Sequence, residues 1–142
     1  MFFSATVLSI AVVAATVATA ASAKPTPSFK RQDEGNLTSC VMSLTADKDV
    51  GNIDFQRELN FVIASSLNIA TNTPIFNLGV VITDVEGSTF TVQDDLSVDN
   101  FTAAETAAIL TGFVSESHPG EGGVIEWTFD SVNCEDATST SE

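Results

Sequence analysis

The chain has 142 residues, of which 44% are hydrophobic, and its 19 acidic against five basic residues give a formal net charge of −14. This length suits one domain, because two halves would each be too small for a stable core. The apolar share is too high for an intrinsically disordered chain. The negative charge repels phosphate, which argues against nucleic acids and anionic membranes as partners.

The first 23 residues have the pattern of a secretory signal peptide. Residues 7–20 are apolar or small, and residues 21–23 (Ala-Ser-Ala) supply the small side chains that a signal peptidase requires. The apolar run is shorter than the roughly 20 residues that span a bilayer, and Pro25 follows closely. We therefore expect cleavage after Ala23 and a secreted, extracellular protein without a membrane anchor.

Residues 24–31 form a short proline-containing segment that ends in the dibasic pair Lys30-Arg31. This layout resembles that of fungal small secreted proteins, in which a kexin-type protease cuts after Lys-Arg. The resemblance implies a propeptide at residues 24–31 and a mature chain that begins at Gln32. The alternative is a disordered N-terminal arm with a chance dibasic pair. Cleavage would leave two cations against all 19 acids, a net charge of −17.

The two cysteines, Cys40 and Cys134, are predicted to form a disulfide, because the secretory route is oxidising. Two free thiols are the alternative. The bond would close a loop of about 94 residues and stabilise the fold by about 4–5 kcal/mol on the chain-entropy model.

The first half of the body predicts a strand, a helix and a hairpin. Residues 38–44 alternate between apolar and polar, as in a strand. Over residues 53–69 the apolar side chains recur at helical spacing, and Pro74 prevents the helix from continuing. Residues 78–83 and 88–92 predict two strands joined by a turn at Gly87.

The second half predicts a helix, a loop and a last strand. Thr102 and Glu105 match a capping box, and Gly112 is placed to end the helix that follows. A glycine-rich loop leads to a strand over residues 124–132, which directs its alternate apolar side chains to the core, namely Ile125, Trp127 and Phe129. Residues 135–142 form an acidic Ser/Thr tail that we expect to be disordered.

The resulting order, β-α-β-β-α-β, predicts a single α+β domain over residues 32–134 with a ferredoxin-like layout. Its sheet would be antiparallel, with two helices on one face. In that layout the last strand lies beside the first, so Cys40 would face Cys134 without distortion. Other α+β sandwiches with paired terminal strands have the same consequence and stay open.

The single imidazole, His118, is interpreted as an exposed loop residue rather than a catalytic base. No Gly-x-Ser-x-Gly motif presents a serine, and the cysteines are expected to be oxidised. Glu116, His118 and Glu121 make only a weak metal candidate, since a glycine-rich loop does not preorganise ligands.

The acids Asp47, Asp49 and Glu58 fall at positions 1, 3 and 12 of a calcium-loop template. The template fails elsewhere, because glycine falls one position early and the preceding element is a strand. We interpret the segment as a turn followed by a helix start. No metal and no cofactor are therefore expected.

Two N-glycosylation motifs occur, at Asn36 and Asn100, each with threonine two residues later. Both lie at expected element boundaries, where an acceptor is accessible. We expect at least one of them to be used.

These observations favour a small secreted, non-enzymatic protein that binds an extracellular protein or glycan, as effector candidates among fungal small secreted proteins do. One alternative is an inhibitor of a subtilisin-like protease, by analogy with ferredoxin-like inhibitors that use a sheet face and a C-terminal tail. Another is a small hydrolase with paired carboxylates. It would need an acid of raised pKa in a deep, aromatic-lined cleft.

Overall fold

The computed structural model describes residues 36–136. The expected signal peptide, the propeptide with Lys30-Arg31 and residues 137–142 lie outside this range. In chain order the elements are β1 (Thr38–Ala46), α1 (Phe55–Thr71), β2 (Ile75–Asn77), β3 (Val81–Glu86), β4 (Thr89–Val98), α2 (Ala103–Gly112), β5 (Ser117–Pro119), a 3-10 turn η2 (Glu121–Gly123) and β6 (Glu126–Asp136).

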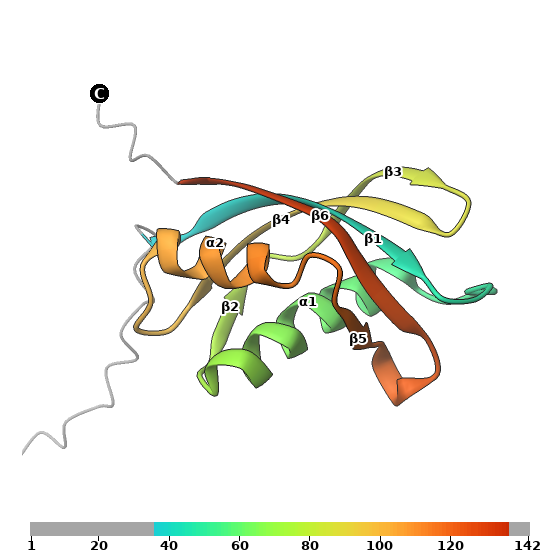
Figure 1. Cartoon of the computed structure of the whole chain (residues 1–142), viewed down its shortest axis with the longest axis horizontal. Helices are drawn as coiled ribbons and strands as arrows, with labels where there is room; N and C mark the ends of the chain where they lie inside the picture. Colours follow the sequence, from blue (N-terminus) through green and yellow to red (C-terminus); the bar gives the residue numbers. More distant parts are fainter. Residues whose placement is uncertain (1–35, 137–142) are drawn as a thin grey trace, which may run out of the picture.

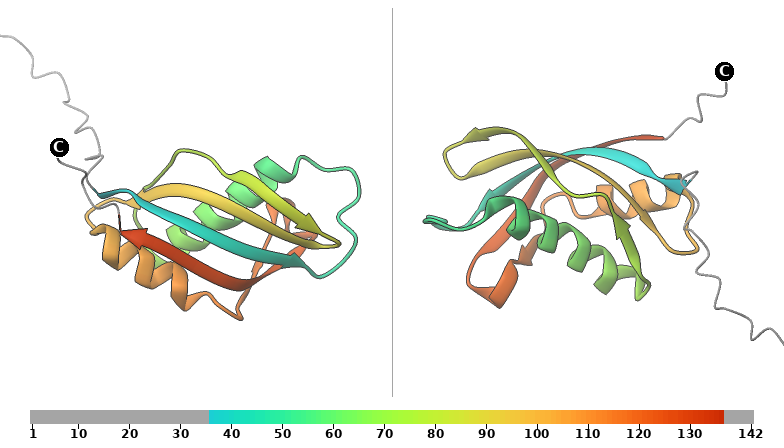
Figure 2. Two further views of the ribbon diagram at one scale, coloured as in Figure 1. Left: turned by 90° about the horizontal axis from the view of Figure 1, so that it is seen from above. Right: turned by 180° about the vertical axis from the view of Figure 1, so that it is seen from behind.

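The strands form one curled antiparallel sheet in the order β2-β4-β1-β6-β5, and β3 also pairs with β4. Both helices lie on the concave face of this sheet, and no helix of residues 36–136 covers its convex face (Figures 1 and 2). The expected α+β class, antiparallel sheet and pair of helices are therefore confirmed. The sheet has six strands, however, and not the expected four.

The two additional strands are three-residue segments that the sequence patterns missed. β2 follows Pro74 directly and pairs with the end of β4, and β3 pairs with the beginning of β4. Gly79, at φ 106°, lies between them and breaks this edge into two pieces. β5 arises within the expected glycine-rich loop by pairing with β6. Segments this short have no measurable alternation, so only the neighbouring strand makes them strands.

The core lies between the sheet and the two helices. Alternate residues of β1 and β4 point inward, and α1 contributes one apolar stripe. Trp127 and Phe129 are fully buried, as the alternation of the last strand predicted. The other fully buried large side chains are Met42, Leu44, Leu59, Val62, Ile63, Leu67, Val80, Val92, Leu96 and Leu110.

A β-bulge in β6 decides which way its second half faces. The register pairs Ser43 with Ser131 but Leu44 with Phe129, which leaves Asp130 as an extra residue. Before the bulge odd-numbered residues face the core, and after it even-numbered ones do, beginning with Val132. Cys134 thereby reaches the helix-facing side of the sheet.

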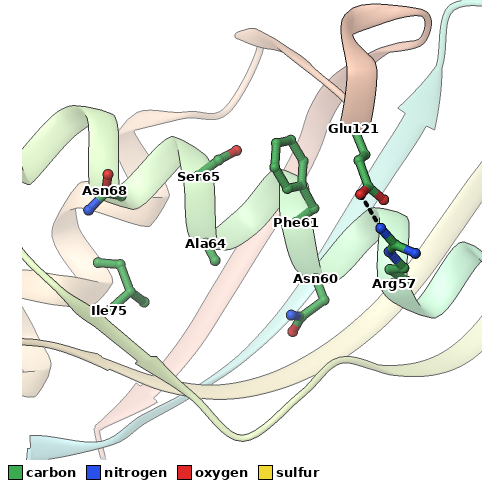
Figure 3. Close-up of a pocket in the computed structure, with 8 residues that line it drawn as sticks. All are labelled: Arg57, Asn60, Phe61, Ala64, Ser65, Asn68, Ile75 and Glu121. Atoms are coloured by element: carbon green, nitrogen blue, oxygen red, sulfur yellow. Dashed lines mark hydrogen bonds and ion pairs between the residues drawn. The ribbon is translucent and has the colours of Figure 1, made fainter.

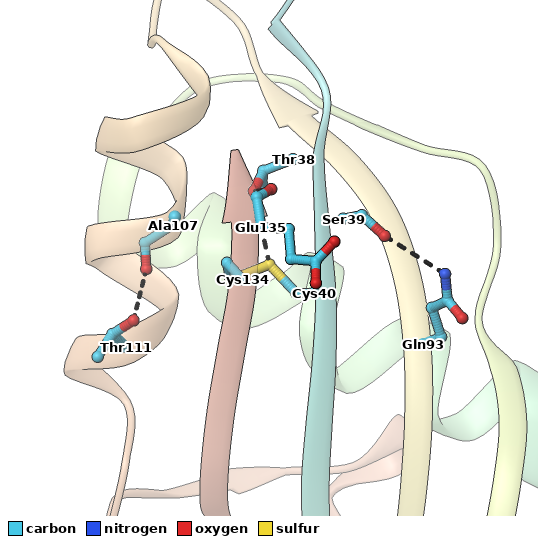
Figure 4. Close-up of a disulfide and its surroundings, with 8 residues drawn as sticks. All are labelled: Thr38, Ser39, Cys40, Gln93, Ala107, Thr111, Cys134 and Glu135. Carbon is cyan, nitrogen blue, oxygen red and sulfur yellow. Dashed lines mark hydrogen bonds between the residues drawn. A yellow bond between two sulfur atoms is a disulfide. The ribbon is translucent and has the colours of Figure 1, made fainter. Parts of the chain in front are cut away.

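The predicted disulfide between Cys40 and Cys134 is present (Figure 4). The two cysteines are register partners on β1 and β6, with their Cα atoms 4.0 Å apart. β6 continues through Glu135 to Asp136, so the strand includes two residues that we assigned to the disordered tail.

The helix ends follow from local capping. The Asp54 side chain accepts a hydrogen bond from the Arg57 backbone N–H at 3.1 Å, so α1 begins at Phe55, two residues later than expected. The predicted capping box of α2 is confirmed, because Thr102 and Glu105 each accept from the other's backbone N–H. No helix among residues 36–136 is long and apolar enough to cross a membrane.

Candidate functional site

A groove of about 480 Å³ runs along the exposed side of α1 (Figure 3). One wall is β2, and the turn η2 closes one end. Its lining combines an aromatic ring, two amides and an ion pair, and the residues are Arg57, Asn60, Phe61, Ala64, Ser65, Asn68, Ile75 and Glu121.

Helical periodicity places the α1 residues of the groove in one row. Arg57, Phe61 and Asn68 are separated by four and seven residues, which puts them on one face of the helix. The adjacent face, which includes Leu59 and Ile63, is buried against the sheet. The amphipathic pattern that builds the core therefore also builds the groove.

Glu58 fixes η2 against α1. This carboxylate is only 6% exposed, and its Oε1 accepts a hydrogen bond from Trp127 Nε1 at 3.1 Å. Its Oε2 accepts from the Glu121 backbone N–H at 3.2 Å. A Cβ at Gly120 would lie 1.9 Å from Glu58 Oε1, so a side chain there would force the Glu58 carboxylate or the turn to move. The contact thus requires both the carboxylate and the glycine.

This contact places the Glu121 side chain beside Arg57, with which it forms an ion pair that spans the end of the groove (Figure 3). Arg57 and Lys48 are the two Lys or Arg residues in the described part of the chain. Because one of them is neutralised here, the groove is close to electrically neutral on an otherwise strongly acidic domain.

A second hollow of about 330 Å³ continues the groove towards the break in the sheet edge. The two hollows share Arg57 and Asn60. Two side-chain amides hold the backbone in place where the sheet edge is interrupted. Gln56 Nε2 donates to the Val80 carbonyl at 2.8 Å, and Asn77 Oδ1 accepts from the Gly79 N–H at 2.6 Å. Asn60 Oδ1 is buried and has no hydrogen-bond partner among the described residues.

Asp94 lies behind this hollow. Its Oδ2 accepts a hydrogen bond from Asn77 Nδ2 at 2.7 Å, whereas its Oδ1 has no partner within residues 36–136. Burial raises the pKa of Asp94 to about 6; the Asn77 hydrogen bond lowers this pKa, and the charge of Asp95 adds to the rise. Asp94 lines neither hollow. Adjacent strand residues face opposite sides of the sheet, so Asp95 cannot serve as its catalytic partner.

The interpretation of His118 as an exposed loop residue is wrong. It lies in β5, its side chain is 18% exposed, and its ring packs edge-on against Phe113 at 4.8 Å and Phe129 at 5.3 Å. Pairing of β5 with β6 draws the ring into this aromatic contact. His118 Nε2 lies 3.6 Å from Glu116, while Glu121 pairs with Arg57 instead.

The other acids considered for metal binding have separate structural roles. Asp47 accepts from the Glu126 backbone N–H, and Asp49 accepts from the Gly51 N–H, each at 3.0 Å. Glu58 accepts hydrogen bonds from Trp127 Nε1 and the Glu121 backbone N–H, as described above. Within the described range no three His, Cys, Asp or Glu side chains are grouped as metal ligands would be.

Sequence reasoning missed Glu58 and Gly120 as the pair that builds the site. A signal for Glu58 was present, because it interrupts an apolar stripe that includes Phe55 and Val62. A carboxylate in such a stripe indicates a buried hydrogen-bonding partner. Nothing local to Gly120 pointed to a contact 62 residues away.

Comparison of this chain with protein-family models, with curated proteins and with solved structures found no match. The fold and site define an acidic, disulfide-linked α+β domain with a near-neutral groove along one helix.

Proposed function

We propose that this chain is a small secreted acidic protein that acts outside the cell by binding, not by catalysis, and that it binds a neutral glycan in the α1 groove. The observation that carries this proposal is the lining of the groove, with Phe61, two asparagines and a self-neutralised ion pair. The disulfide is compatible with an oxidising, extracellular environment.

The dimensions and chemistry of the groove favour an oligosaccharide. A volume of about 480 Å³ falls in the range of small-ligand pockets. Phe61 is 40% exposed and offers an apolar ring for the faces of sugar rings. Amides both donate and accept hydrogen bonds, which matches sugar hydroxyls. Asn68 Nδ2 already donates to the Thr73 carbonyl, so Asn68 offers its oxygen.

Electrostatics supports a neutral ligand. The domain as a whole repels polyanions, and its second cation, Lys48, lies 3.6 Å from Asp47. A cationic ligand would find many carboxylates outside the groove and would not be selected by it. A neutral ligand has no such competing sites.

We also propose that the fold is an elaborated ferredoxin-like sandwich. Supporting this, β2 and β3 both pair with β4 along one edge and can be counted as one interrupted strand. With β5 treated as an addition, the remaining order is β2/β3-β4-β1-β6, and both helices cover one face.

The glycan proposal is tested by calorimetric titration of the protein with short chito-, cello- and manno-oligosaccharides. We expect at least one to bind, and we expect Phe61→Ala to weaken that binding about tenfold. Phe76→Ala is the matched control, because Phe76 is 37% exposed against 40% for Phe61 and lies outside the groove.

Absence of binding to all three series, or equal loss in both variants, would overturn the assignment of the groove. If the protein binds none of these sugars but inhibits a subtilisin-type protease, its partner is a protein. That result would support the alternative function of a protease inhibitor.

A further inference from the structure

The two N-glycosylation motifs both have the pattern Asn-x-Thr, but their threonines differ in how deeply the folded domain buries them. Asn36 and Asn100 are both exposed. The motif is recognised through two groups, the asparagine amide and the hydroxyl two residues later, so access to that hydroxyl matters as much as access to the amide.

Thr38, the third residue of the first motif, is fully buried, and Figure 4 shows it beside the disulfide. Its backbone lies between Leu96 of β4 and Asp136 of β6 in the register. Its Oγ1 donates to the Glu135 carbonyl at 3.1 Å and lies 3.8 Å from Cys40 Sγ. Exposure of this hydroxyl therefore requires the start of β1 to separate from both β4 and β6, next to the disulfide that joins β1 to β6.

Thr102, the third residue of the second motif, is exposed at the N-terminus of α2. Among the described residues its hydroxyl hydrogen-bonds to Glu105 alone, accepting from the Glu105 N–H at 3.2 Å and donating to Glu105 Oε2 at 3.0 Å. Fraying of the first helical turn is enough to release it, and such local opening is far less costly than separation of central strands. Asn100 itself lies in a turn at φ 66°.

We propose that folding gates these sites unequally: Asn36 accepts a glycan only before β6 pairs with β1, whereas Asn100 also accepts one on the folded domain. In each transfer the asparagine amide nitrogen attacks C1 of a lipid-pyrophosphate-linked oligosaccharide. The C1–oxygen bond breaks, the lipid pyrophosphate leaves, and the amide loses one proton.

The order of synthesis defines the period in which Asn36 can react. β6 is the last element of the described chain and carries Cys134, so the first motif is open until the end of the chain arrives. Closure of the disulfide then ends this period. A glycan on Asn36 is therefore added before the domain is complete.

The test uses the full chain, made in bacteria without glycans, in two forms: folded and oxidised, or reduced and alkylated in urea, so that an alkyl group on the fully buried Cys40 prevents β6 from pairing with β1 again. Each form is incubated with a single-subunit oligosaccharyltransferase and lipid-linked oligosaccharide, and occupancy at each asparagine is measured by peptide mass spectrometry. In the folded form we expect Asn36 to be modified at least about tenfold less than Asn100. In the reduced form we expect similar occupancy at both sites.

A Thr102→Ala variant is the control for site assignment, since it removes the second motif and leaves the first intact. Equal occupancy of both sites on the folded, oxidised chain would overturn the proposal. So would a reduced chain in which Asn36 is still poorly modified, because the difference would then lie in the local sequence. Neither result depends on the groove or on the secretion route.

Discussion

Glu58 and Asp94 are both buried carboxylates, and they differ in how their oxygens are satisfied. Both oxygens of Glu58 accept hydrogen bonds, from Trp127 Nε1 and from the Glu121 N–H. Among the described residues, Asn77 is the one side-chain donor to Asp94, and Asp94 Oδ1 has no partner. An ionised carboxylate with an unsatisfied oxygen is costly to bury, which explains the raised pKa of Asp94.

The raised pKa predicts the direction in which stability depends on pH. The folded state holds the Asp94 proton more tightly than the unfolded chain, since burial raises the pKa from 3.8 to about 6. The contribution of Asp94 to the free energy of unfolding therefore falls as pH rises through this window and is constant above it. The total change amounts to at most about 3 kcal/mol.

The variant Asp94→Asn tests this prediction, because the amide keeps an acceptor for Asn77 and cannot ionise. Urea unfolding between about pH 4 and about pH 7 should show a smaller loss of stability with rising pH than in the native protein, and greater stability near pH 7. The exposed Asp84→Asn serves as control. An unchanged pH slope in Asp94→Asn would contradict the assignment.

Gly120→Ala tests the contact that positions η2. The new Cβ would lie 1.9 Å from Glu58 Oε1, so the turn must move away and the hydrogen bonds of Glu58 must weaken. We expect a loss of about 1–3 kcal/mol in the free energy of unfolding, measured by urea titration. Gly112→Ala is the matched control, because an added Cβ there meets nothing within 4 Å. Equal effects of the two substitutions would show that Glu58 does not hold the turn.

At the scale of elements, the bulge at Asp130 has the largest consequence. It reverses the facing of β6 between Phe129 and Val132, so that Trp127 and Cys134, seven residues apart, face the same side. Strict alternation would have directed Cys134 to the convex face, away from Cys40. The predicted disulfide is thus correct, although strict alternation of the last strand does not account for it.

Deletion of Asn133, which follows the bulge, should prevent the disulfide. Without this residue Cys134 takes the position directly after Val132 and points to the convex face, away from Cys40. We expect both thiols to react with iodoacetamide in denaturant, as measured by intact mass. Deletion of Asp130 is the control, because it removes only the extra residue of the bulge and keeps Cys134 on the helix-facing side, so its disulfide should form. A bonded Asn133 deletion variant, or free thiols in the Asp130 deletion variant, would contradict this account of the strand.

The elements differ in how well they could be predicted, and the reason is where their stabilising contacts lie. α1 and α2 were predicted because a capping residue, a run of helical spacing and a stop signal all occur within each segment. β2 and β5 were missed because they are strands only through β4 and β6. Because β5 was missed, His118 was interpreted as an exposed loop residue, although it lies in this strand.

At the scale of the whole molecule, the disulfide joins the two ends of the described domain. It links residues 94 positions apart on neighbouring central strands. Such a link lowers the conformational entropy of the unfolded chain and so raises its free energy. The folded state is thereby stabilised relative to the unfolded chain.

We expect the double variant Cys40→Ser/Cys134→Ser to lose about 4–5 kcal/mol in the free energy of unfolding, measured by urea titration. The serine side chains fit the same positions, so circular dichroism should still report the native helices and strands. Chemical reduction of the native protein is the second measurement and should give a similar loss. Stability that is unchanged by both treatments would contradict the prediction.

Local patterns were sufficient for the α+β class, both helices, the hairpin and the pairing of Cys40 with Cys134, because each depends on spacing within a short segment or on a choice with one partner. The groove was not accessible in this way. It needs Glu58 of α1 to meet the turn at Gly120 and Trp127 of β6, and Glu58 lies more than 60 residues before both of them. These long-range contacts depend on how the sheet curls over its helices. Local sequence patterns do not determine that curvature, so they could not predict the groove.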